Sequence, residues 1–409
     1  MAQRVLITGL SSQIGGRLAL ALEPNPAIEA LIGIDTEDPR HEFGRTEFVR
    51  VGVARRSLRR IIRAAQIDTV VDTRLITDAV AAPMGTIEAV NVDGTAELLD
   101  VCGGPESPVR AVIVKSSAAW YGCEPGDPAF FSEDMSRSRP PRTGLERSIV
   151  AAETGVAEFA ARQPHCRVAV LRLASELAVR GPSSLRGLLT APVIPGILGF
   201  DPRLQVIHGE DIVGALAHAV SEPIHGIYNA AADGVLSLSE TASLLGKTLV
   251  PVLPPWGSEF AAAQLHRLGL RVPVDLIRQL RYGRGLDNRR LKAAGYRYRY
   301  TSREALIALR GRMRQRALLG AGQDRYRYEP DLEEFLRWSP SVRRLPERNE
   351  GATARPRDGF DALGAGELID LIPSLEAEAL RALRRYETEH QRRADVLEAL
   401  ERSLTRLGG

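Results

Sequence analysis

The chain has 409 residues, of which 44% are hydrophobic and 26% charged, the composition of a globular protein with a sizeable core. Its 54 basic and 51 acidic residues give a net charge of +3, too even a balance to predict nucleic acid as the main ligand. No apolar run is long enough for a membrane helix, and no leader pattern is evident, so we expect no transmembrane segment. Cys102, Cys123 and Cys166 lack metal or disulfide spacing and favour the reducing cytoplasm.

Over the first part of the chain, short Val- and Ile-rich runs alternate with helical patterns. Strands that alternate with helices indicate a parallel sheet covered on both faces, which binds ligands at its carboxyl edge. The sequence therefore predicts an α/β, Rossmann-type doubly wound fold whose core spans residues 1–175. The expected strands are 4–8, 31–35, 47–51, 69–72, 111–116 and 167–172, and the expected helices are 14–21, 58–65, 84–101 and 147–162.

Residues 176–339 are less regular, with proline-rich turns between helices expected at 211–220 and 238–245. We expect a smaller substrate lobe there, interleaved with the main sheet, to which a strand near 226–231 returns. Residues 340–362, rich in Arg, Pro, Glu and Gly, predict a linker.

The last part of the chain, residues 363–409, predicts a C-terminal helical hairpin. Its two helices are expected at 374–390, capped by Ser374, and at 392–404. Leucines lie on one side of each helix, and so short a segment buries little core by itself. Residues 367–409 are therefore expected to contact a protein partner, a second copy of the chain or the body of the same chain.

A strand, a turn and a helix at the N-terminus predict a nucleotide site. The start of such a helix attracts a diphosphate, and Gly9 and Gly15 let the backbone approach it. Asp35, 20 residues after Gly15, can accept the ribose hydroxyls of NAD and repel the 2′-phosphate of NADP. Ser12 stands where a middle glycine is usual and fits only if its φ is negative or if the turn shifts. Alternatively, the turn only packs the helix on the sheet. The expected cofactor residues here are Thr8, Gly9, Ser12, Gln13, Ile14, Gly15 and Asp35.

Further motifs follow in order: Asp68–Val71, Asn91–Thr95, Ser116–Gly122, Leu171–Ser175, Asp201–Asp211 and Tyr228–Ala231. With the N-terminal turn, they make residues 3–310 resemble the extended short-chain dehydrogenase/reductase superfamily. The likeness is to its NAD-dependent epimerase/dehydratase group, and within it to an actinobacterial epimerase-like branch. It implies NAD as cofactor and a nucleotide-sugar or another hydroxylated small molecule as substrate.

The resemblance also assigns roles to two polar residues. Asn91 would join the cofactor site by supporting the sheet beside it; the alternative is that it only packs a helix on the sheet. Ser117 falls at the catalytic serine position, four residues before Tyr121, where a hydroxyl would bind a substrate carbonyl or alcohol. The alternative for Ser117 is that it only satisfies a strand end.

The proton-transfer pair of the family is missing. Active relatives carry Tyr-x-x-x-Lys on one helix face, where a tyrosine of lowered pKa exchanges a proton. Those positions fall here on Leu145 and Ile149, and the guanidinium of Arg147 does not titrate near neutrality. The third strand also lacks its usual Asp, and Arg74 stands where relatives have small residues. We expect Arg74 to fill part of the cofactor cleft or to pair with Asp72.

Other polar residues offer little replacement chemistry. Tyr121 belongs to a structural turn, and Glu146 is expected on a solvated helix face. His208 is expected to order a turn and Asp211 to cap the next helix, and the histidines predict no metal site. Two interpretations remain: an NAD-dependent epimerase, dehydratase or reductase with a non-standard acid–base residue, or a non-catalytic nucleotide-binding scaffold or sensor that recruits a partner through the hairpin.

Overall fold

The computed structural model describes residues 3–52, 55–104, 106–177, 182–253, 272–319, 364–372, 377–390 and 392–407. The chain divides into two compact units, Met1–Leu309 and Arg310–Gly409. The predicted linker, 340–362, and the predicted cap Ser374 lie outside the described residues, so the boundary at 339/340 stays a prediction. No helix in the described ranges is both long and apolar enough to cross a membrane.

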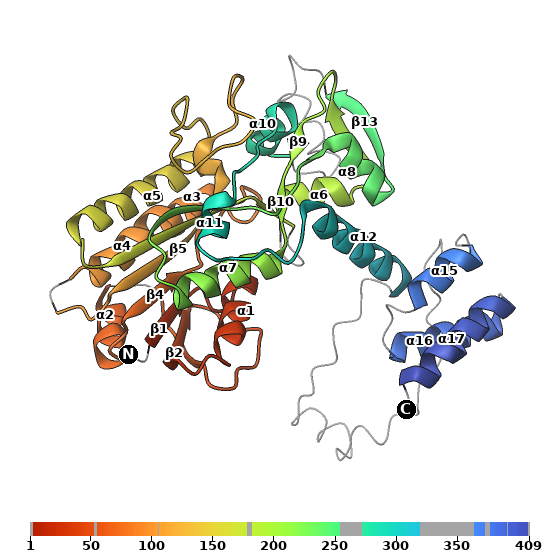
Figure 1. Cartoon of the computed structure of the whole chain (residues 1–409), viewed down its shortest axis with the longest axis horizontal. Helices are drawn as coiled ribbons and strands as arrows, with labels where there is room; N and C mark the ends of the chain where they lie inside the picture. The colour runs from red at the N-terminus through yellow and green to blue at the C-terminus, as the bar shows by residue number, and fades with distance from the viewer. Residues whose placement is uncertain are drawn as a thin grey trace, which may run out of the picture. The chain divides into compact units, whose positions relative to one another are not determined.

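A parallel sheet forms the centre of the first unit (Figure 1). Within the described residues it has seven strands in the order β11-β6-β5-β4-β1-β2-β3. Chain order reverses beside β1, which places the ligand-binding crevice at the carboxyl ends of β1 and β4. The predicted Rossmann-type fold is confirmed. The strands are β1 (Gln3–Thr8), β2 (Ile28–Asp35), β3 (Glu47–Arg50), β4 (Thr69–Asp72), β5 (Ala111–Ser117), β6 (Arg167–Leu173) and β11 (Gly226–Ala230).

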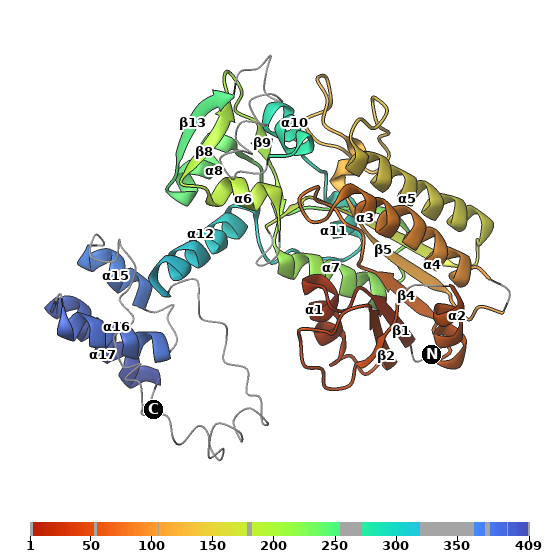
Figure 2. The ribbon, with the colours of Figure 1, turned by 180° about the vertical axis from the view of Figure 1, so that it is seen from behind.

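Alternate residues of each strand enter opposite cores, because successive side chains of a strand point to opposite faces. Val5 and Ile7 pack with α1 (Gln13–Leu22) and α7 (Gly209–Ser221). Leu6 packs on the other side, with helices from 55–64, 94–102 and 144–162. Figures 1 and 2 show these two helical layers from opposite sides. The second layer comprises α2 (Arg55–Ala64), α4 (Gly94–Cys102) and α5 (Gly144–Arg162), with α3 (Met84–Glu88) and the π-helical turn η1 (Ala89–Asp93) leading into α4.

A buried ion pair fixes α5 to the sheet. Arg172 of β6 is 1% exposed, and its Nη2 lies 2.7 Å from Oε2 of Glu153 on α5. The Ser116 hydroxyl of β5 donates to the other oxygen of Glu153. The guanidinium carbon also lies 3.4 Å from the ring centroid of Trp120, so one cation joins two strands, a helix and the turn after β5.

The smaller lobe follows β6. The strand expected near 226–231 is β11, which pairs in parallel with β6, so the predicted return to the sheet is confirmed. The other short pairs are β7 (Ser175–Glu176) with β10 (Val206–Ile207), β8 (Val193–Ile197) with β13 (Thr248–Leu253), and β9 (Arg203–Leu204) with β12 (Leu236–Ser237). The helices of this region are α6 (Ser184–Thr190), α8 (Leu238–Leu245), α10 (Val274–Tyr282), α11 (Arg289–Ala293) and α12 (Ser302–Leu319).

The cap expected for α7 is wrong. His208, not Asp211, is the N-cap, and its Nδ1 accepts the Glu210 N–H at 3.3 Å. Asp211 is fully buried and accepts the N–H groups of Arg299 and Tyr300 at 2.7 and 3.1 Å. Its carboxylate therefore anchors the segment before α12, a role that depends on residues far along the chain.

Among the described residues from 364 onward there are three helices, one more than the hairpin that the sequence predicts. The described helices are α15 (Ala365–Leu371), α16 (Ala377–Glu389) and α17 (Ala394–Leu407). Leu368, Leu380 and Leu400 of the three helices share a small apolar core. The extra helix supplies apolar surface that two helices alone lack.

Replacing Glu153 with Gln should lower the free energy of unfolding by about 3–5 kcal/mol, because Arg172 would remain buried without a counter-charge. The matched control is Glu158→Gln on the same helix, whose carboxylate is 62% exposed and pairs with Arg162; its effect should stay within about 0.5 kcal/mol. Urea denaturation of both variants measures the difference. Equal effects would contradict the importance given to the buried pair.

Candidate functional site

A cavity of about 260 Å³ opens at the carboxyl edge of the sheet. Its walls come from the segments after β4 and β6, the end of β5, the start of α5, and α10 with the segment that follows it. Among its lining residues, Arg74, Lys115, Arg284, Asp78, Glu146, Glu176 and Asp275 carry charge, and Ser117 and Leu145 stand at the expected catalytic positions.

The turn between β1 and α1 has the geometry of a phosphate-binding turn. Gly9 has φ +81°, and a Cβ on Gly15 would lie 2.1 Å from the Gly9 carbonyl oxygen, so glycine is required at both positions. Ser12 has φ −68°, which meets the condition set by its side chain. Its hydroxyl accepts the Gly15 N–H at 3.0 Å and caps α1. Serine therefore replaces the middle glycine without strain.

The same turn leaves donors for an anion. The N–H groups of Gln13 and Ile14 start α1 and make no hydrogen bond to a described residue. Asp35, at the end of β2, accepts the Ser11 N–H at 2.9 Å and the Thr36 N–H at 2.7 Å. It forms no ion pair within the described part of the chain, so each oxygen keeps a lone pair for a ribose hydroxyl. These residues fit the diphosphate and adenosine ribose of a dinucleotide.

Two of the expected cofactor residues are engaged elsewhere. Thr8 is fully buried, and its hydroxyl donates to Asp72 Oδ1 at 2.7 Å. Asn91 is also fully buried: its amide donates to the Ile76 carbonyl at 2.9 Å and the Ser148 hydroxyl at 3.1 Å, and its oxygen accepts the Ile76 N–H. Both side chains hold the walls of the cleft and have no polar atom left over for a ligand.

Arg74 pairs with Asp72 and also occupies part of the cofactor cleft, the two alternatives that the sequence predicted for it. Its Nη2 lies 2.6 Å from Asp72 Oδ2, and its chain lies so close to the turn that a Cβ on Gly9 would come within 2.9 Å of Arg74 Cγ. Burial opposes ionisation of Asp72, but the guanidinium and its hydrogen bonds outweigh it and lower the pKa of that carboxyl. Arg74 therefore places a positive charge at the edge of the cavity, where the Asp72 carboxylate neutralises it.

Ser117 combines a structural contact with access to the cavity. Its hydroxyl accepts the Ala119 N–H at 3.2 Å and caps the 3-10 turn η2 (Ala118–Tyr121). It donates no hydrogen bond to a described residue, so its proton can be given to a ligand oxygen. Tyr121, by contrast, donates to Asn229 Oδ1 at 2.9 Å and stacks on Phe131, and burial raises its pKa. The Tyr121 side chain is therefore part of the hydrophobic core.

The positions that the sequence analysis predicts for the proton-transfer pair are apolar. Leu145 is 3% exposed and lines the cavity, while Ile149, one turn further along α5, is fully buried. Both pack with Leu75, Ile87 and Ala119. These apolar side chains offer no proton to the cavity.

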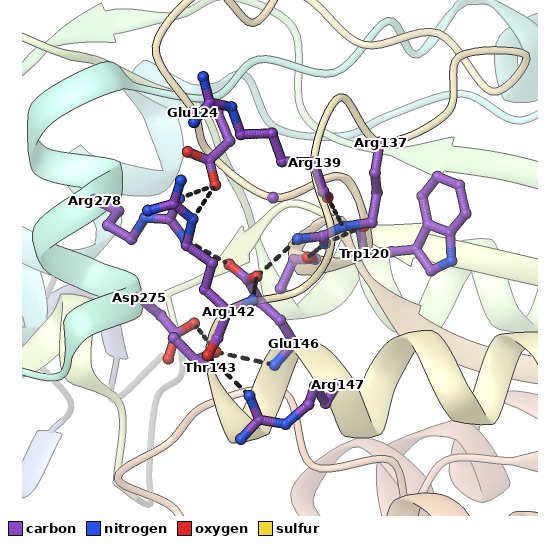
Figure 3. A network of polar contacts seen from close by, with 12 residues as sticks. Trp120, Glu124, Arg137, Arg139, Arg142, Thr143, Glu146, Arg147, Asp275 and Arg278 are labelled. Carbon is purple, nitrogen blue, oxygen red and sulfur yellow. Dashed lines mark hydrogen bonds and ion pairs between the residues drawn. The ribbon is translucent and has the colours of Figure 1, made fainter.

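Glu146 is buried, not solvated as its position on the helix had indicated. It is 3% exposed, and Figure 3 shows it between Arg137 and Arg142 of the loop before α5 and Arg278 of α10. Its Oε2 lies 2.7 Å from Arg137 Nη2 and accepts the Arg142 N–H at 2.9 Å, and its Oε1 lies 3.4 Å from Arg278 Nη1. Arg278 of α10 also pairs with Glu124. With both oxygens occupied, Glu146 ties α5 to α10.

Sequence reasoning missed Lys115 and Glu176. Both are partly buried and line the cavity, Lys115 on β5 two residues before Ser117 and Glu176 on β7. Burial lowers the pKa of the Lys115 ammonium, against the opposing carboxylates of Glu176 and Asp72. Burial raises the pKa of Glu176, against Lys115 and Arg17. The signal was present in the sequence, because Lys115 is one of only three lysines beside 51 arginines and interrupts an apolar strand.

This architecture is a Rossmann-type α/β fold, and comparison with known proteins identifies the family of the chain. The model of the NAD-dependent epimerase/dehydratase family matches residues 5–231. An uncharacterized protein of Mycobacterium tuberculosis, Rv0501, is 33% identical over 309 residues, which are 74% of this chain and 81% of that protein. The chain belongs to the NAD-dependent epimerase/dehydratase family.

Solved structures share the fold at low identity. MoeE5 in complex with UDP-glucose and NAD is 21% identical, with a TM-score of 0.57 over 76% of this chain and 99% of that one. The UDP-glucuronic acid 4-epimerase of Bacillus cereus in complex with NAD is 16% identical, with a TM-score of 0.59 over 80% of this chain and 100% of that one. At these identities the likeness establishes the fold alone.

Proposed function

We propose that this protein binds NAD(H) at the turn after β1 and a nucleotide-sugar or related hydroxylated molecule in the cavity. It would be an epimerase/dehydratase-like protein whose standard tyrosine–lysine chemistry is lost. The observation that carries this proposal is Asp35, a carboxylate held by two backbone N–H groups beside the glycine turn and without an ion pair among the described residues. MoeE5, which shares the fold, has been solved with UDP-glucose and NAD.

In this proposal each group of residues has its own role in binding the cofactor or the substrate. Gly9, Gly15 and the N–H groups of Gln13 and Ile14 hold the diphosphate, and Asp35 orients the adenosine ribose. Bound NAD⁺ supplies an acceptor for hydride from a carbinol carbon. Ser117 donates a hydrogen bond to the substrate oxygen, and Leu145 keeps water from the reacting carbon.

A second candidate is a non-catalytic scaffold or sensor. It is favoured by the apolar side chains of Leu145 and Ile149 and by the Arg74–Asp72 pair at the cleft edge. In this reading the dinucleotide is bound without turnover. The buried, unpaired cysteines are consistent with a cytoplasmic location for either candidate.

The C-terminal unit supplies the contact with other proteins in this proposal. Leu383, Tyr386 and Leu404 are only partly buried against its core, so apolar surface remains for a partner or a second copy of the chain. Protein binding by the C-terminal unit agrees with the scaffold candidate and is equally compatible with the enzyme candidate.

The wild-type chain should bind NAD⁺ more tightly than NADP⁺, because the Asp35 charge repels a 2′-phosphate. Asp35→Asn should weaken NAD⁺ binding about tenfold or more, since a hydrogen bond to a charged group contributes about 1.5–3 kcal/mol. Asp38→Asn is the control, because Asp38 is 66% exposed and pairs with Arg50. Titration calorimetry measures all three proteins with both cofactors. Tighter NADP⁺ binding by the wild type would overturn the cofactor assignment.

Deleting 363–409 should leave the melting temperature of the remaining chain unchanged, because the described cores of the first unit contain no residue from this segment. The deletion should also abolish self-association or partner binding. Calorimetry and solution mass, measured on the full and shortened chains, test this. Aggregation of the shortened chain would show instead that the segment is part of the fold.

A further inference from the structure

We propose that Lys115 is the proton-exchanging residue of this cavity, in place of the missing tyrosine. This inference rests on the proposed function and deepens it by naming the acid–base group. Lys115 lies on β5 two residues before Ser117, and both side chains line the same cavity, as expected for residues i and i+2 of a strand.

Lys115 is placed as a ligand-contacting group. Its ammonium makes no hydrogen bond and no close ion pair with any described residue, although it is partly buried. A buried charge without a partner is unfavourable in a protein interior unless a ligand or a change of protonation relieves it. A lysine that lines a cavity can bind a ligand and can also lose its proton. Arginine, the cation used almost everywhere else in this chain, cannot lose its proton.

The surrounding charges set the titration of Lys115. The Glu176 carboxylate from β7 and the Asp72 carboxylate from β4 favour the ammonium, but burial outweighs them and lowers its pKa. Glu176 in turn lies near Arg17 of α1 and Arg186 of α6. The charged groups on the remaining walls of the cavity are Arg74, Asp78, Glu146, Asp275 and Arg284. A lysine with a lowered pKa is neutral at a lower pH than a solvated lysine and can act as a base there.

The proposed step balances. The neutral amine of Lys115 takes the hydroxyl proton of the substrate while the hydride leaves the same carbinol carbon for NAD⁺. An alcohol thus becomes a ketone, NAD⁺ becomes NADH, and the amine becomes an ammonium. Return of the hydride and of the Lys115 proton regenerates an alcohol. Ser117 donates a hydrogen bond to the oxygen in both directions.

Because the chain has only three lysines, the titration of Lys115 can be followed separately by NMR. Reductive methylation of the full chain with ¹³C-formaldehyde should label Lys115, Lys247 and Lys292 beside the α-amino group. In NMR titrations, the Lys115 resonance, assigned by its loss in Lys115→Arg, should titrate at lower pH than the other two. Glu176→Gln should move it lower still, because a carboxylate that favours the ammonium is removed. Adding NAD⁺ and UDP-glucose should shift this resonance and leave that of Lys292, exposed and paired with Asp233, unchanged.

A kinetic arm uses unmethylated protein, with NAD⁺ and UDP-glucose as the probe and hydride transfer followed at the nicotinamide absorbance. Lys115→Arg should lower the rate by about 10²–10⁴-fold, the usual contribution of general acid–base catalysis, and Lys292→Arg should not. The wild-type rate should rise with pH and level off at the pH where Lys115 titrates in the NMR experiment.

The outcomes separate the two proposals. Failure of NAD⁺ to bind in calorimetry overturns the proposed function and the Lys115 role with it. Binding of NAD⁺ and UDP-glucose, with all three lysines titrating together or with an unchanged rate in Lys115→Arg, overturns the Lys115 role alone. Binding without any hydride transfer also overturns that role and leaves the scaffold reading.

Discussion

The buried ion pair between Arg172 and Glu153 holds together the elements that build the site. It connects β6 with the middle of α5, and the Ser116 hydroxyl of β5 adds a third attachment to the same carboxylate. Neither charge can be left unpaired in the interior without a large cost, so the helix and the two strands keep one relative position. The Trp120 ring against Arg172 extends this constraint to the turn that Ser117 caps. The places of Ser117 and Leu145 in the cavity wall follow from this arrangement.

A second set of buried charges lies beside the cavity, whose wall includes Glu146. Glu146 joins Arg137 to Arg278, and Arg278 joins Glu124, so that α10 of the smaller lobe is attached to the start of α5 (Figure 3). The wall of the cavity carries Leu145, at the position that the resemblance predicts for the family's tyrosine, and Lys115 of β5. In our account, the cofactor turn of the family has been kept while the proton-transfer group has moved from a helix to a strand.

Local patterns made much of the fold predictable. The strand–turn–helix at the N-terminus depends on the glycine geometry of a few neighbouring residues and was predicted, whereas the cap that Ser12 provides was not. The resemblance to the family placed Leu145 and Ile149 at the positions of the tyrosine–lysine pair, and that assignment stays a prediction. The roles of Glu146 and Asp211 were not predictable, because their partners Arg278 and Arg299 lie 132 and 88 residues away. The charge pattern of one helix cannot show such a partner, and it predicts exposure instead. Lys115 is marked in the sequence only as a rare lysine in an apolar strand, and the cavity that it lines with Glu176 of β7 exists only in the folded chain.

The most direct test of this account is the transfer of an isotope. The full-length protein would be incubated with NAD⁺ and with UDP-glucose deuterated at the carbinol carbons of the sugar, and the cofactor would be recovered for mass spectrometry. Our account predicts deuterium in the reduced nicotinamide, with less label as the pH falls and Lys115 becomes protonated. Bound NAD⁺ that stays unlabelled at every pH, while both ligands occupy the protein, would contradict it.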